Sequence, residues 1–174
     1  NDFTTCLYNK EQIDSILLDF SKAFDKVDHE GLILKIQHSG INNSLLFWIK
    51  SFLSSRRQQV IVEGKKSDPQ PVLSGVPQGT VLGPLLFLIY INDIDSGLSP
   101  GTKIRLFADD SFLYRVIRNK KDSEILQKDL ETLQIWERTW KMEFHPQKCQ
   151  VLTITNKRKP IKSTYTINDY PLLE

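Results

Sequence analysis

Short runs of alternating apolar and polar residues predict a sheet in this chain. Residues 104–114 alternate on both sides of Asp109 and Asp110, and this period of two indicates two strands joined by a hairpin with the aspartates at its tip. The apolar run from Ile13 to Phe20 predicts a buried strand that carries a third carboxylate, Asp19, near its end. Further strands are expected over residues 58–63, 72–73, 150–155 and 164–168.

Apolar residues spaced by three or four predict four helices between these strands. The first is expected from about Glu30 to Ser39, and the second begins after a cap at Asn43 or Ser44. The third has an apolar body over residues 85–94, and the fourth is a long amphipathic helix capped by Asp122 and reaching Trp140.

The order of these elements predicts an α+β fold. Without an insertion over residues 30–78, the order is β-α-β-β-α-β, which is the ferredoxin-like or split β-α-β arrangement. In such a sheet the first strand and the hairpin can lie side by side, so Asp19 is expected to meet Asp109 and Asp110. The 174 residues are enough for one domain with a core of its own, and we expect a single domain over 1–174.

Composition narrows the functional classes only slightly. Hydrophobic residues make up 40% and charged residues 25%, which is typical of a globular protein, and a net charge of +2 is too small to indicate nucleic-acid binding. Cys6 and Cys149 are far apart, so neither a zinc site nor a disulfide framework is expected, and a reducing compartment is the simplest interpretation. The longest apolar run, residues 85–91, is too short for a membrane span, so no membrane partner is expected.

The three aspartates are the strongest candidates for chemistry. Like charges held side by side at a hairpin tip repel each other unless a cation neutralises them, and a third hard oxygen ligand favours Mg²⁺. Asp19, Asp109 and Asp110 therefore suggest a metal site for phosphoryl transfer. The alternative is an exposed acidic turn and an unrelated surface aspartate.

Four blocks of sequence follow one another along the chain: LDFSKAFDKVDH at 18–29, SGVPQGTVLGPL at 74–85, FADD at 107–110 and HPQKC at 145–149. In this order they resemble the palm of reverse transcriptases, in particular those of non-LTR (LINE-type) retrotransposons of the jockey-like group. The third block alone is weak evidence, but all four in this order and spacing are specific. The fourth is the least secure, because the family often has Asn where this chain has His145.

The resemblance implies the core of an RNA-directed DNA polymerase that adds dNTPs to the 3′ end of a DNA primer on an RNA template. It implies two Mg²⁺ ions, with Mn²⁺ as a possible substitute, held by Asp19, Asp109, Asp110 and the backbone carbonyl of Phe20, with Asp110 as the least direct ligand. It also implies residues 30–78 as a partial fingers-side insertion, with the rest of the fingers upstream and a thumb downstream of this chain. The expected location is intracellular, in the nucleus or cytoplasm as a ribonucleoprotein.

Four further residues acquire roles through the resemblance. Phe24 would lie under the sugar of the incoming nucleotide and exclude a 2′-hydroxyl; otherwise it is a core aromatic. Gln78 and Gly79 would contact the nucleotide or template; otherwise they form a helix-entry loop. Lys148 would protonate the departing pyrophosphate; otherwise it is a solvated surface lysine.

A basic cluster flanks the strand expected at 58–63. Arg56, Arg57, Lys65 and Lys66 could neutralise phosphates of an A-form-like hybrid, although such clusters are commonly solvated surfaces. Two other functions stay open: a catalytically inactive nucleic-acid-binding remnant or ribonucleoprotein scaffold, and a palm polymerase that copies RNA into RNA. Phe24 argues against the last of these. The sequence leaves the oligomeric state open.

Overall fold

The computed structural model describes residues 2–173, and the chain divides into two compact units. Residues 1–21 and 93–174 form one, here called the sheet unit, and Lys22–Asn92 form the other, here called the helical unit. The division differs from the expected 30–78 insertion, and the single-domain interpretation stays a prediction. No helix among the described residues is long and apolar enough to cross a bilayer.

A four-stranded antiparallel sheet forms the sheet unit and confirms the mixed α+β class. Its strands are β1 (Gln12–Leu18), β6 (Thr102–Phe107), β7 (Asp110–Val116) and β8 (Gln150–Thr155), in the order β6-β7-β1-β8. In the register, Ile16 of β1 lies opposite Leu113 on one side and Val151 on the other. All but one of the β1 side chains are buried, as expected for a central strand.

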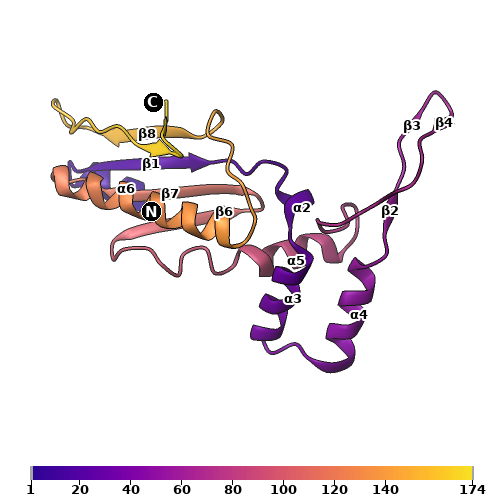
Figure 1. The fold of residues 1–174 in the computed structure, drawn as a ribbon. Helices are drawn as coiled ribbons and strands as arrows, with labels where there is room; N and C mark the ends of the chain where they lie inside the picture. The colour runs from indigo at the N-terminus through magenta and orange to yellow at the C-terminus, as the bar shows by residue number, and fades with distance from the viewer. Residues whose placement is uncertain (1, 174) are drawn as a thin grey trace. The chain divides into compact units, whose positions relative to one another are not determined.

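Helix α6 (Lys120–Thr139) runs along the sheet (Figure 1) and buries Leu126, Leu130 and Leu133. The expected cap at Asp122 is wrong by three positions. Asn119 is the N-cap, and Asp122 is the third helical residue of a capping box in which each side chain accepts from the other residue's backbone N–H.

Short elements that the pattern did not predict complete the sheet unit. Helix α1 (Asp2–Tyr8) precedes β1, and its Cys6 packs with Ile13 and Tyr114. Strands β9 (Thr166–Ile167) and β10 (Tyr170–Pro171) form a small hairpin where one strand over 164–168 was expected.

The helical unit contains four helices, and a thin β-arm extends from it (Figure 1). The helices are α2 (Ala23–Lys26), α3 (His29–His38), α4 (Asn43–Leu53) and α5 (Leu82–Ile91). The arm is made of β2 (Arg57–Gln58), β3 (Ile61–Val62), β4 (Lys65–Lys66) and β5 (Gln70–Pro71), which pair as β2-β5 and β3-β4. The single strand expected over 58–63 is therefore wrong, and β5 replaces the strand expected at 72–73. Every arm strand is solvent-exposed, so no buried face fixes a longer ladder.

Candidate functional site

Asp19 lies directly after β1, at one end of the sheet. The last β1 residue, Leu18, is paired with Ser111 of β7. Continuing this antiparallel register by one residue sets Asp19 opposite Asp110, the first residue of β7. Two of the three predicted carboxylates thus belong to the same end of neighbouring strands, although they are 91 positions apart.

The hairpin turn is shifted by one residue from the expected position. Phe107 pairs with Asp110, so the two turn residues are Ala108 and Asp109 rather than Asp109 and Asp110. Ala108 has φ +54°, whereas Asp109 is not in the positive-φ region, which is the combination of a type II′ turn. Asp109 and Asp110 are both exposed at this end.

Backbone contacts from the fourth sequence block hold Asp19 in place. The Asp19 carbonyl accepts a hydrogen bond from the His145 N–H at 2.8 Å, and the Asp19 N–H donates to Cys149 Sγ at 3.5 Å. Burial raises the pKa of the Cys149 thiol, so this sulfur acts as a neutral acceptor. Sequence reasoning gave Cys149 no role, and the only signal was its place in the fourth block.

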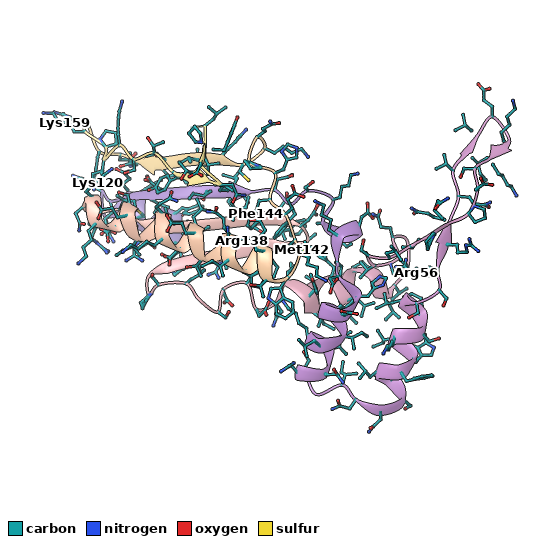
Figure 2. The ribbon with its side chains drawn as sticks, viewed as in Figure 1. Arg56, Lys120, Arg138, Met142, Phe144 and Lys159 are labelled. Atoms are coloured by element: carbon teal, nitrogen blue, oxygen red, sulfur yellow. The ribbon has the colours of Figure 1, made fainter. Side chains whose placement is uncertain are left out.

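Phe20 continues from Asp19 into an isolated bridge with Phe144. The two rings stack with centroids 4.6 Å apart, and Figure 2 labels Phe144 in this part of the sheet unit. The hydrogen bonds of the bridge are made by the Asp19 carbonyl and the Ser21 N–H. The bridge therefore does not use the carbonyl of Phe20.

The side chain of Asp19 has the character of a cation ligand. Its Oδ1 is closed off from solvent and accepts no hydrogen bond from the residues that the structure describes. A carboxylate oxygen in that position is costly unless a positive charge faces it. Lys148 supplies one such charge, with Nζ at 3.4 Å from Oδ1.

The three aspartates do not form a closed metal cage by themselves. Over residues 2–173, no three Asp, Glu, His or Cys side chains gather closely enough to hold a metal ion. The structure therefore shows Asp19 in direct contact with Lys148 and, by the strand register, opposite Asp110. The convergence of all three aspartates on one site stays a prediction.

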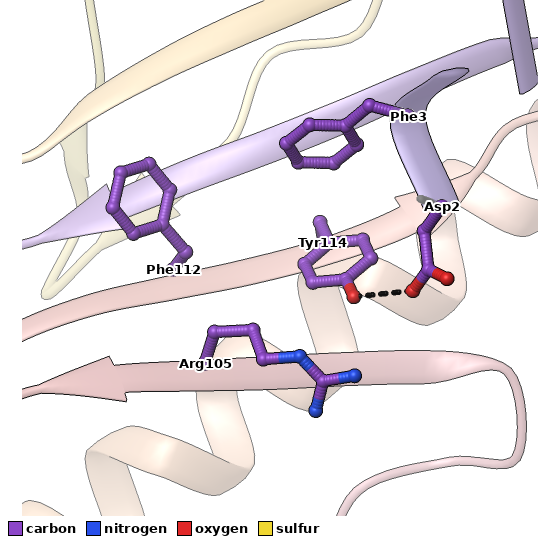
Figure 3. Close-up of a pocket in the computed structure, with 5 residues that line it drawn as sticks. All are labelled: Asp2, Phe3, Arg105, Phe112 and Tyr114. Carbon is purple, nitrogen blue, oxygen red and sulfur yellow. Dashed lines mark hydrogen bonds between the residues drawn. The ribbon is translucent and has the colours of Figure 1, made fainter. Parts of the chain in front are cut away.

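A pocket opens on the sheet beside the hairpin (Figure 3). Asp110, Phe112 and Tyr114 alternate along β7 and therefore share one face of the sheet. The cavity is about 440 Å³ and is lined by Asp2, Phe3, Arg105, Phe112 and Tyr114. Tyr114 donates its hydroxyl to Asp2 at 2.6 Å, and the Asp2 carboxylate also pairs with Lys103 at 2.8 Å. These two contacts lower the pKa of Asp2 to about 2.

The nucleotide-binding candidates Phe24, Gln78 and Gly79 all belong to the helical unit. Phe24 is half-buried and stacks on Phe87 with ring centroids 4.4 Å apart. The Gln78 side-chain amide donates to Asp25 Oδ1 at 2.9 Å. Gly79 has φ +75°, and an added Cβ would meet nothing within 4 Å, so its backbone conformation, rather than crowding, favours glycine.

The four basic candidates differ from one another. Arg57, Lys65 and Lys66 are exposed on the arm, where phosphate contacts are physically open to them. Arg56 is half-buried, and Figure 2 labels it near the root of the arm. Its guanidinium donates to the carbonyls of Leu53 and Gly75. The sequence alone groups Arg56 with the other three basic residues, because its partners are backbone carbonyls, which every residue has.

The chain is similar to known polymerases over most of its length. A family model described as "Reverse transcriptase (RNA-dependent DNA polymerase)" matches residues 6–165. The RNA-directed DNA polymerase from mobile element jockey of Drosophila melanogaster is 34% identical over 161 residues, which cover 86% of this chain and 17% of that protein. The probable RNA-directed DNA polymerase from transposon X-element of the same organism is 33% identical over 172 residues, which cover 97% of this chain and 19% of that protein. The chain thus spans less than a fifth of the length of these curated relatives.

Solved structures show the same fold at low sequence identity. Apo telomerase from Candida tropicalis matches with a TM-score of 0.63 and 13% sequence identity, and the match covers 95% of this chain and 35% of the telomerase chain. Telomerase from Candida tropicalis in complex with a TWJ fragment of telomeric RNA matches 87% of this chain and 28% of its own, also with a TM-score of 0.63 and 13% identity.

Proposed function

Because the chain belongs to the reverse transcriptase family and is related to polymerases of non-LTR retrotransposons, we propose that it forms the palm core of an RNA-directed DNA polymerase. The observation that carries this proposal is the solvent-excluded Asp19 Oδ1 just after β1, which accepts no hydrogen bond from the described residues and lies across the register from Asp110. The strand order β6-β7-β1-β8, with helical segments after β1 and after β7, agrees with a ferredoxin-like palm in which 30–78 is a partial fingers insertion.

The donor set fits divalent metal ions. Asp19, Asp109, Asp110 and the carbonyl of Phe20 offer hard oxygen atoms of the kind that Mg²⁺ or Mn²⁺ takes. Asp19 Oδ1 accepts no hydrogen bond from the described residues, and the Lys148 ammonium faces it at 3.4 Å. When bound, two such ions activate the primer 3′-hydroxyl and stabilise the charge on the departing pyrophosphate.

The remaining residues of the sheet end would orient groups and move a proton. The His145 N–H and Cys149 Sγ fix the backbone of Asp19, which limits the directions its carboxylate can take. Lys148 reaches the same carboxylate and is the candidate that gives a proton to a pyrophosphate oxygen.

Residues of the helical unit would select the nucleotide and hold the template–primer hybrid. Phe24, held by its stack on Phe87, would exclude a ribose 2′-hydroxyl. Gln78 and Gly79 would contact the nascent base pair. Arg57 and the two arm lysines, Lys65 and Lys66, would neutralise backbone phosphates. Action on an RNA template implies a ribonucleoprotein inside the cell, in the nucleus or the cytoplasm.

One observation favours a second function. The exposed basic residues of the arm, Arg57, Lys65 and Lys66, would equally serve a non-catalytic nucleic-acid-binding remnant or ribonucleoprotein scaffold, because phosphate contacts need no metal site. Primer extension on an RNA template with Mg²⁺ separates the two. Extension with dNTPs supports the polymerase, hybrid binding without extension supports the remnant, and extension with NTPs alone indicates an RNA-copying enzyme.

The sugar-selection role of Phe24 has its own test. Phe24→Ala should admit ribonucleotides, because removing the ring opens room for the 2′-hydroxyl. Phe47→Ala, which removes a ring exposed on α4, is the matched control and should leave selection unchanged. Unchanged dNTP-over-rNTP preference in Phe24→Ala would remove this residue from the proposal.

A further inference from the structure

Arg56 is directed into the helical unit rather than towards solvent. Its Nη2 donates to the Gly75 carbonyl at 2.6 Å, and its Nε donates to the Leu53 carbonyl at 3.1 Å. The fork of the guanidinium thus links the last residue of α4, Leu53, to the loop at Gly75, which lies 19 positions after Arg56 in the chain. The next residue, Arg57, is exposed and donates to the carbonyl of Pro69 on the arm.

The Gly75 carbonyl also receives a second side-chain donor. His29 Nε2, at the start of α3, lies 2.9 Å from this oxygen and 3.3 Å from Arg56 Nη2. Because a carbonyl can only accept, Nε2 must carry the proton, and it therefore cannot accept one from Arg56. His29 and Arg56 are thus two donors to one oxygen, and we call these two side chains and Gly75 the Gly75 clamp.

Gly75 has no freedom to move away from this arrangement. Its N–H donates to the Val27 carbonyl at 2.8 Å, so both of its backbone groups are bonded. Its φ is +83°, and an added Cβ would lie 2.8 Å from the Cα of Asp25. Glycine is therefore required twice, for conformation and for space.

The clamp lies within a series of bonds that joins two sequence blocks. From the second block, the Ser74 hydroxyl donates to the Asp25 carbonyl at 2.8 Å, and the Val76 N–H donates to the Phe24 carbonyl at 2.9 Å. The Gln78 amide reaches the Asp25 carboxylate. Gly75 is at the centre of this series, so whatever holds its carbonyl also holds the backbone beside Phe24 and Gln78.

We propose that Arg56 and His29 are positioning residues for nucleotide selection, which act by holding the Gly75 carbonyl and, through it, Phe24 and Gln78. The role in nucleotide selection rests on the proposed polymerase function. The mechanical role, in which Arg56 and His29 hold the Gly75 carbonyl, is independent of that function. It assigns Arg56 a role different from that of Arg57, Lys65 and Lys66, which remain candidates for phosphate contact.

Amide hydrogen exchange of the 174-residue chain tests the mechanical role without any activity measurement. In Arg56→Ala, exchange at the Gly75 and Val76 amides should accelerate about tenfold or more, because a charged hydrogen bond that holds the loop is lost. Arg56→Lys should give an intermediate rate, because lysine can reach one of the two carbonyls but not both. Arg57→Ala should leave both amides unchanged. Equal exchange in Arg56→Ala and the wild type would overturn the inference.

Kinetics and binding then separate positioning from phosphate contact. In Arg56→Ala, the KM for dNTP should rise about tenfold and discrimination against rNTPs should fall, with affinity for an RNA–DNA hybrid and its salt dependence unchanged. Arg57→Ala should show the reverse: weaker hybrid binding and a smaller salt slope, with sugar discrimination intact. A smaller salt slope in Arg56→Ala, with unchanged sugar discrimination, would overturn the inference.

Two further outcomes remain decisive. If Arg56→Ala does not fold, His29→Ala removes the other donor and should give the same pattern with a smaller effect; normal exchange at Gly75 in that variant would contradict the clamp. If the wild type does not extend primers, the proposed function fails, whereas the exchange measurement still decides the clamp.

Discussion

The sheet unit and the helical unit hold their candidate site residues by different means. Asp19 and Asp110 are set by a main-chain register that runs the length of β1 and β7. The loop over residues 74–78 belongs to no helix or strand beyond an isolated bridge at Ser74. The Gly75 and Val76 N–H groups and side chains from distant segments hold it. The sheet positions its residues through many backbone hydrogen bonds, whereas the loop has few of them and also needs polar side chains that one substitution can remove.

The largest effect on activity is expected at the hairpin turn. Asp109→Ala should lower primer extension by about a thousandfold or more, because under the proposed function the turn loses one of its candidate metal ligands. The free energy of unfolding should stay level or rise slightly, because repulsion with Asp110 is relieved. Extension kinetics and chemical denaturation measure the two quantities, with the exposed Asp95→Ala as control. Extension that stays near the wild-type rate would remove Asp109 from the site.

The largest effect on stability is expected inside the sheet. Ile16 of β1 is fully buried, so Ile16→Ala should cost about 2–5 kcal/mol of unfolding free energy. Ile61→Ala makes the same change on the arm, where the side chain is 61% exposed, and should cost less than about 0.5 kcal/mol. Urea denaturation compares them, and equal losses would contradict the difference in packing between sheet and arm.

The two glycines Gly75 and Gly64 sharpen the comparison within the helical unit. Both have positive φ, +83° and +79°, but an added Cβ at Gly64 would meet nothing within 4 Å, whereas at Gly75 it meets Asp25. Gly64→Ala should therefore cost about 1 kcal/mol from backbone strain alone, and Gly75→Ala about 2–4 kcal/mol. Thermal or urea unfolding tests the ranking. Equal costs would mean that the loop can yield by enough to accept a methyl group.

The smallest effect is expected from the exposed contacts of Asp2. Hydrogen bonds from Lys103 and Tyr114 lower the pKa of Asp2 from 3.8 to about 2. A carboxyl group with a lowered folded-state pKa stabilises fully above about pH 4, and this contribution is lost as the pH falls through about 2. Asp2→Asn should therefore show a shallower loss of stability between pH 4 and pH 2. Identical acid unfolding curves for the variant and the wild type would show that the ion pair adds nothing measurable in solvent.

The elements of the sheet could be predicted because period-two patterning and burial agree there. Residues 150–155 were expected as a strand and form β8. The buried strand expected over residues 13–20 forms as β1 but ends at Leu18, so Asp19 follows the strand instead of lying within it. The predictions of the turn and of the helix cap were wrong because, in each case, two residues suit the same position. Aspartate tolerates either hairpin position, and only the pairing of Phe107 with Asp110 moves the turn to Ala108 and Asp109. Asn119 and Asp122 are both good caps, and only their reciprocal hydrogen bonds decide between them.

The residues of the candidate site could be named from four sequence blocks, but their supports could not. Arg56 was grouped with its exposed neighbours because a basic cluster in sequence says nothing about which side chain turns inward. Its partner is a backbone carbonyl, which any residue possesses, and the distance along the chain hides the contact. Cys149 was missed for the same reason, since its partner is the Asp19 N–H.

A direct titration of metal binding tests the central claim, that Asp19 and the hairpin aspartates share divalent cations. Mn²⁺ binding to the folded chain can be followed by electron paramagnetic resonance, with Asp19→Asn, Asp109→Asn and the control Asp95→Asn. We predict that the first two variants each weaken binding about tenfold or more and that the control binds as the wild type does. Wild-type affinity in both Asp19→Asn and Asp109→Asn would contradict the claim.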